Sequence, residues 1–127
     1  MTRSLLLIFL IFILAVAGCS RGVDKAELPG RYEFSLDNMK QQVTIGADGK
    51  YSNALYRGGA LVWSEQGVWT YYEAAKKGRT EIMLDKFRFG IPEYASGGSW
   101  FVVPEKTLTG VKALCFDPDL NRCFRAS

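Results

Sequence analysis

The chain has 127 residues, of which 48% are hydrophobic, and this length suits one small folded domain with little room for a second. The formal net charge is only +3, and the 16 basic side chains are dispersed, so the charge does not indicate nucleic-acid binding. The chain has no histidine, which excludes catalytic triads that use a histidine base and metal sites built on histidine.

The first 18 residues have the pattern of a secretory signal peptide. Arg3 supplies a positive charge, and the 13 residues at 5–17 form an apolar run, shorter than the roughly 20 residues that span a bilayer. Small residues at 16–18 lead into Cys19, and this motif resembles the lipobox of bacterial lipoproteins. The resemblance implies cleavage before Cys19 and lipidation of its thiol with acyl chains such as palmitate. An uncleaved membrane anchor is the alternative.

Residues 19–28 are expected to be a lipid-anchored polar tether, followed by one β-barrel-like domain at 29–127. Two or more acyl chains hold a protein stably on a membrane. Ser20 follows the cysteine, and in Gram-negative sorting a serine at that position permits export to the outer membrane. We therefore expect a periplasm-facing protein on the inner leaflet of the outer membrane.

Short runs of aromatic and β-branched residues, separated by Gly, Asn and Asp, predict about eight strands. They are expected at 31–36, 42–45, 50–56, 60–72, 80–87, 100–103, 107–116 and 122–124. Asp48-Gly49 indicates a tight hairpin, and Gly67 inside the fourth run predicts a bulge or bend. The expected fold class is all-β: an antiparallel meander of short strands that forms a small closed or half-open barrel.

Cys115 and Cys123 remain as an even pair when Cys19 is assigned to lipid, and an exported protein folds in an oxidising setting. We predict a disulfide that closes the last hairpin. A reactive thiol pair is the alternative, although the C-x-x-C spacing of redox motifs is absent. Asp117 begins a segment similar to a calcium loop, but its twelfth position would fall beyond residue 127, so no metal is expected.

The mature sequence is similar to a diffuse group of small bacterial lipoproteins with a lipocalin-like or half-barrel β domain. The resemblance depends on an opening L-x-G-x-Y, a D-G-x-Y hairpin, a G-x-W strand, a hydrophobic strand and a later G-x-W. The matching segments are 28–32, 48–51, 67–69, 82–87 and 98–100. That group carries no assigned activity, so the resemblance implies a fold and not a function.

The longest expected loop, 90–99, contains Pro and Gly and is bordered by large side chains. Loops on a β scaffold are free to carry contacts, and exposed aromatics with arginine are typical of protein-binding patches. We predict that Arg88, Phe89 and Tyr94 contribute to a binding surface. The alternative is that these aromatics belong to the core, because a small barrel needs large side chains inside.

Scattered carboxylates and the absence of a phosphate-binding glycine motif give no sign of an enzyme or a cofactor. We expect a non-enzymatic lipoprotein that binds a protein or an envelope component. One alternative is a lipocalin-like carrier of a small apolar ligand, which would need an apolar cavity in the barrel. Another is a protein similar to membrane-bound lysozyme inhibitors, whose Ser-Gly-containing loop enters the enzyme's cleft. Residues 96–99 resemble that loop only loosely.

Overall fold

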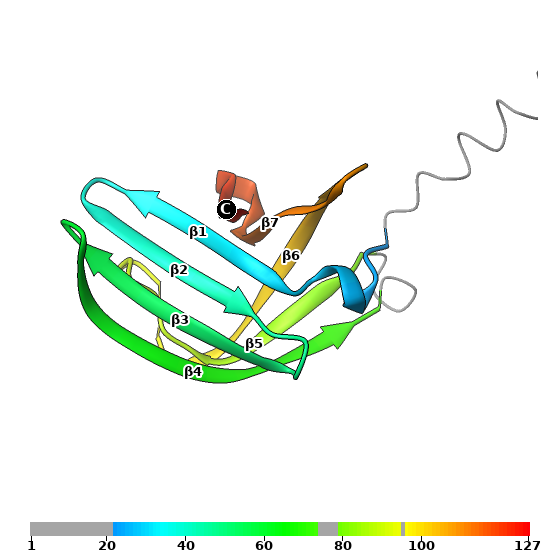
Figure 1. The fold of residues 1–127 in the computed structure, drawn as a ribbon, viewed down its shortest axis with the longest axis horizontal. Coiled ribbons are helices and arrows are strands. Elements are labelled where there is room, and N and C mark those ends of the chain that lie inside the picture. Colours follow the sequence, from blue (N-terminus) through cyan, green and yellow to red (C-terminus); the bar gives the residue numbers. More distant parts are fainter. Residues whose placement is uncertain (1–21, 74–78, 95) are drawn as a thin grey trace, which may run out of the picture.

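The computed structural model describes residues 22–73, 79–94 and 96–127. Within them, eight strands form an antiparallel meander, most of which can be followed in Figure 1. The last strand, β8, pairs with β1 and closes a barrel. The strands are β1 (Gly30–Leu36), β2 (Met39–Ile45), β3 (Lys50–Arg57), β4 (Ala60–Tyr72), β5 (Glu81–Phe87), β6 (Gly98–Thr107), β7 (Gly110–Asp117) and β8 (Arg122–Ala126). Short 3-10 helices, η1 (Lys25–Glu27) and η2 (Pro118–Leu120), precede β1 and β8. The predicted all-β barrel is confirmed.

Because successive strands run in opposite directions, the connections between them alternate between the two ends of the barrel. The proximal end carries residues 22–29 and the turn at 46–49, and the distal end carries the turn at 58–59 and the segment 88–97 between β5 and β6. In Figure 1 the proximal end lies on the right, where the chain enters the barrel, and the β3–β4 turn marks the distal end on the left.

A bulge or a bend is expected at Gly67, and the structure has no bulge there. Gly67 pairs in register with Tyr51, and the register between β3 and β4 shifts instead at Leu55 and Tyr56. A Cβ atom at Gly67 would collide with the ring of Tyr51, whose hydroxyl donates a hydrogen bond to the carbonyl oxygen of Asp85. Gly67 therefore makes room for a buried aromatic ring on the neighbouring strand, which is a second reason for glycine within a strand.

Side chains from all eight strands meet in the interior. Phe87 lies at the centre of an aromatic group, with ring centroids 5.8 Å from Tyr51, 4.8 Å from Phe89 and 5.9 Å from Phe124. Aliphatic side chains surround these rings and are almost fully buried: Val43, Ile45, Leu55, Ile82, Leu84, Val102 and Leu114. The barrel is thus filled by its own side chains, as is usual for a barrel of eight strands.

Residues 22–28 belong to the folded domain, which corrects the predicted tether over that part. Val23 and Leu28 are buried, and the Val23 amide donates to the Thr80 hydroxyl at 3.0 Å. The Tyr71 hydroxyl donates to the carbonyl oxygen of Val23 at 2.7 Å, and the Tyr32 hydroxyl donates to that of Leu28 at 2.8 Å. The apolar side chains and these hydrogen bonds close the proximal end, so the domain starts before residue 29.

The signal peptide and Cys19 lie outside the described residues, and cleavage and lipidation therefore stay predictions. Gly22 is the first described residue, three positions after Cys19 in the sequence. Across the described part of the chain, no helix combines the length and the apolar character that crossing a bilayer requires.

β1 and β8 close the barrel over a short distance. Their register comprises two residue pairs, Tyr32 with Ala126 and Glu33 with Arg125, whereas every other pair of neighbouring strands has at least four. A groove of about 390 Å³ runs along the two strands, over the paired residues Glu33 and Arg125 and past the point where the pairing ends, to Ser35 and Cys123. We call this opening the seam.

Candidate functional site

The segment after β5 turns into the distal end of the barrel instead of standing away from it. Phe89 is 6% exposed and Ile91 is 3% exposed, so both belong to the core. The Phe89 ring packs edge-on against Phe87 and Trp100, with both centroids at 4.8 Å. Most of the Phe89 ring therefore fills the distal end, as the alternative of a core role expects, while the residue also borders the groove described below.

Two buried amide side chains hold this segment in place. Gln41 on β2 donates to the Asn53 side-chain oxygen and to the Arg88 carbonyl oxygen, each at 2.8 Å. The Gln41 side-chain oxygen accepts from the Gly90 amide at 2.9 Å, and Asn53 on β3 also donates to the Arg88 carbonyl at 2.8 Å. We call Gln41 and Asn53 the amide clamp. It satisfies backbone groups that would otherwise be buried without partners.

Gly90 lets the segment approach the clamp closely. A Cβ atom there would lie 2.5 Å from a methyl carbon of Leu55 and 3.0 Å from the Met39 sulfur. Carbon atoms in contact prefer separations of about 3.5–4.0 Å, so a larger residue would require the ends of the Leu55 and Met39 side chains to shift. Glycine at this position therefore allows the close approach without such a shift.

Tyr94 is partly buried and links the segment to β7 and β8. Its hydroxyl donates to the Asp117 carboxylate at 2.7 Å and accepts from the Arg122 guanidinium at 3.1 Å. Burial, with the hydrogen bond to Asp117, raises the pKa of Tyr94 above its ordinary value, so the hydroxyl keeps its proton. Its ring packs against Phe89 at 5.1 Å. Tyr94 therefore acts largely as a structural residue.

Arg88 is the predicted binding residue whose side chain reaches the surface, with 45% of it exposed. The guanidinium lies 4.5 Å from the ring centroid of Trp63, and one of its nitrogens is 3.1 Å from the Glu65 carboxylate. Trp63 and Glu65 stand on β4 where it begins at the distal end. The cation is thus held over an aromatic ring while it stays open to a partner.

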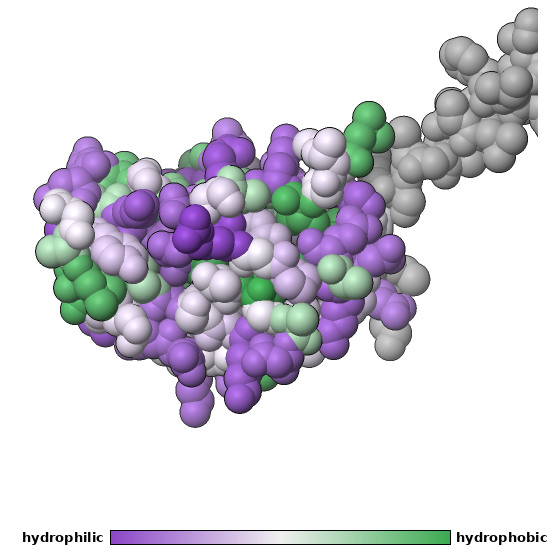
Figure 2. Space-filling model, in the orientation of Figure 1, coloured by the Kyte–Doolittle hydropathy of each residue, from purple (hydrophilic) through white to green (hydrophobic). Residues whose placement is uncertain are grey.

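A groove of about 340 Å³ opens beside Arg88 at the distal end, and we call it the distal groove. Its border includes Arg57, Val62, Trp63, Arg88, Pro92 and Tyr94. Leu61 and Val62 are 57% and 50% exposed, and Figure 2 shows an apolar patch over the start of β4 on an otherwise mostly hydrophilic face. The groove therefore combines two guanidinium groups with aromatic and aliphatic surface.

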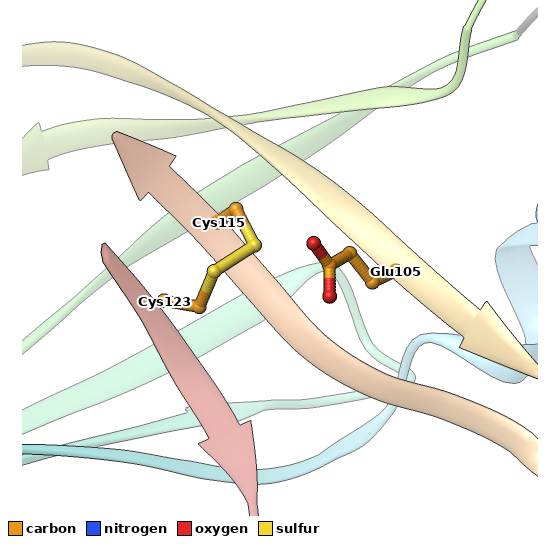
Figure 3. Close-up of side chains that lie close together, drawn as sticks. All are labelled: Glu105, Cys115 and Cys123. Atoms are coloured by element: carbon orange, nitrogen blue, oxygen red, sulfur yellow. A yellow bond between two sulfur atoms is a disulfide. The ribbon is translucent and has the colours of Figure 1, made fainter. Parts of the chain in front are cut away.

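The disulfide between Cys115 and Cys123 is present, as predicted, and joins directly opposed residues of β7 and β8. Both cysteines are buried. Figure 3 shows Glu105 on β6 pointing toward the disulfide, and ligand atoms of these three residues lie within 4.8 Å of one another. Metals bind the thiolate form of cysteine, and sulfurs joined in a disulfide do not offer it.

Comparisons with known protein families, with curated proteins and with solved structures find no match to this chain.

Proposed function

We propose that the protein is a lipid-anchored, non-enzymatic binding protein of the bacterial envelope. In this proposal the distal groove holds an acidic, partly apolar segment of another envelope protein. The proposal depends on one observation: two arginines and two apolar side chains border the same groove. These residues are Arg57, Arg88, Val62 and Trp63. A guanidinium forms forked hydrogen bonds with carboxylates, while aromatic and aliphatic surface is what a protein partner buries at the centre of an interface.

The position of the groove supports the same conclusion. Cys19 precedes Val23 by four residues, which span at most about 14 Å when extended. A lipid on Cys19 would therefore lie near the proximal end, where Val23 is buried. The distal groove would then face away from an outer-membrane inner leaflet and into the periplasm. The filled interior gives no comparable support to a carrier of small apolar ligands.

The anchor is tested by Cys19→Ala. Only the cysteine thiol accepts the diacylglyceryl group, so we expect palmitate labelling of the full-length protein in cells to disappear in this variant. Ser20→Ala is the control and should keep the label. Label that persists on Cys19→Ala would overturn the lipid-anchored part of the proposal.

The groove is tested by a photocrosslinking residue placed at Val62 or at Val68. Both valines lie on β4 and are similarly exposed, at 50% and 55%, but only Val62 borders the distal groove. We expect a specific crosslinked product in intact cells from position 62 and none from position 68. Equal products from both positions, or a product from position 68 alone, would place the contact elsewhere.

The charge requirement is tested at the two ends of β3. Arg57→Glu should abolish the product from position 62, because it puts a carboxylate beside an acidic partner segment. Lys50→Glu makes the same charge change at the proximal end of the strand and should leave the product unchanged. If both variants crosslink normally, the partner is not recognised by its acidity.

A further inference from the structure

We infer that the seam between β1 and β8 is a second binding site, which takes an extended segment of a partner protein by strand addition. This site is separate from the distal groove and does not depend on it. The two-residue register between β1 and β8 leaves strand edges free beside a groove of about 390 Å³. Free edges carry backbone donors and acceptors that can pair with another chain.

The backbone groups that face the seam belong to Ser35 and Cys123. The Ser127 amide donates to the Arg31 carbonyl oxygen at 3.1 Å, so odd-numbered residues of β1 direct their backbone groups toward β8. Continued along the strands, the register places Ser35 opposite Cys123, two residues beyond the last pair, Glu33 with Arg125. The ladder between the two strands therefore stops just before this pair.

The disulfide gives independent support that the backbone groups of Cys123 on β8 face the seam. Cys123 and Cys115 are directly opposed, and their Cα atoms are 3.9 Å apart, which is the close spacing of a pair without mutual hydrogen bonds. The N–H and C=O groups of Cys123 thus point away from β7 and toward the seam. An extended segment that enters the seam finds pairing groups on both sides.

The lining of the seam defines the side chain that such a segment would carry. Phe34 borders the groove, is only partly buried, and packs on Phe116 and Phe124 with ring centroids at 5.2 and 6.3 Å. Because successive side chains of a strand alternate between faces, one side chain of the added strand would rest on this aromatic group. The occupant is therefore an extended segment with an apolar residue between polar ones.

The probe is an end-capped, fluorescent peptide that alternates threonine and valine around a central phenylalanine. Its matched control has the same sequence with N-methyl groups on alternate backbone nitrogens, which removes their donors. We expect the purified full-length protein to bind the first peptide and not the second. Hydrogen exchange should show new protection of the Ser35 and Cys123 amides on binding, while Arg57→Glu leaves peptide binding unchanged.

The decisive variant is Ser35→Pro, which removes the seam-facing N–H. That N–H is not used by β2, because residues 36 and 39 close the two-residue turn and the next pair, Ser35 with Lys40, is not mutually hydrogen-bonded. Binding should weaken about fivefold to tenfold, the effect of one backbone hydrogen bond, while Ser35→Ala binds normally. If Ser35→Pro does not fold, the exchange measurement on the unmodified chain decides.

Three results would overturn the inference. Equal binding of the N-methylated peptide would mean that side chains alone make the contact. Unchanged exchange at Ser35 and Cys123 would mean that any binding lies elsewhere. Concentration-dependent dimers of the full-length protein that Ser35→Pro abolishes would identify a second copy of this chain, rather than a partner protein, as the occupant.

Discussion

The two ends of the barrel are closed by different means. At the proximal end, Val23 and Leu28 cover the opening, and tyrosine hydroxyls bind their carbonyl oxygens from the rim. At the distal end, the segment after β5 enters the barrel and is held from inside by the amide clamp, Gln41 and Asn53. The proximal closure uses chain that precedes the barrel, whereas the distal closure uses a connection between strands.

The proximal closure is therefore local, whereas the distal closure is part of the core. Loss of the proximal closure would release residues 22–28 and leave eight paired strands behind. Loss of the distal closure would remove Phe89 from the aromatic group around Phe87, because the clamp and the ring hold the same segment. A buried polar group without a partner is also more damaging than an exposed one. We therefore expect mutations at the distal end to have the larger effects on stability.

The largest effect is expected for Gln41→Leu. This change leaves the Gly90 amide and the Asn53 side-chain oxygen buried without their partner, which should lower the free energy of unfolding by about 2–4 kcal/mol. Urea denaturation measures it. Gln66→Leu, at an exposed position of β4, is the control and should change stability by less than about 0.5 kcal/mol. Equal effects of the two substitutions would show that the clamp does not hold the distal end.

The next largest loss of stability is expected when the disulfide is removed, because this bond closes the distal loop that contains η2. Replacing Cys115 and Cys123 together by alanine opens a loop with a sequence separation of 8, for which chain entropy gives roughly 2–3 kcal/mol. We expect the same loss when the unmodified protein is unfolded under reducing conditions. Alkylation without reductant should find no free thiol at either position. If reduction leaves the unfolding midpoint unchanged, the bond does not stabilise the distal end.

Alternating side chains made the barrel predictable, but the amide clamp was missed. Strands of this chain bury every second residue, and on β2 the buried residues are 39, 41, 43 and 45, of which all but Gln41 are apolar. The same alternation puts Gln41 on the inner face, yet the predicted strand began at 42 and excluded it. Asn53 lies between two buried residues of β3 in the same way. A polar residue inside an apolar alternation on two neighbouring strands was the available signal.

The segment after β5 could not be placed from its own sequence. Its proline and glycines are typical of an exposed loop, and that pattern assigned Phe89 to the surface. The groups that hold it inside lie far away in the chain, since Gln41 is 47 residues from Arg88 and 49 from Gly90. Local propensity contains no information on such partners. The disulfide was predictable because the expected lipidation of Cys19 leaves two cysteines, and an exported protein is expected to fold in an oxidising setting.

A smaller effect is expected at the proximal end from Tyr71→Phe. The variant loses the hydrogen bond to the Val23 carbonyl, which should lower the free energy of unfolding by about 1 kcal/mol. Limited proteolysis with trypsin should then cut faster after Lys25, because residues 22–28 detach without global unfolding. Tyr56→Phe, on a half-exposed ring near Lys40, is the control. A loss as large as that of Gln41→Leu would contradict the distinction between the two ends.

The smallest effect on stability is expected for Arg88→Ala, although Arg88 lies in the distal segment. The clamp holds this residue by its carbonyl oxygen, and that group is kept in the variant. The lost side-chain contacts, to Trp63 and Glu65, are partly exposed, and such contacts together contribute less than about 1 kcal/mol. Denaturation of Arg88→Ala should therefore resemble that of the unmodified protein, while crosslinking from position 62 should fall. A large loss of stability would make the guanidinium a structural group of the distal closure, and unchanged crosslinking in a stable variant would remove Arg88 from the distal groove's contacts.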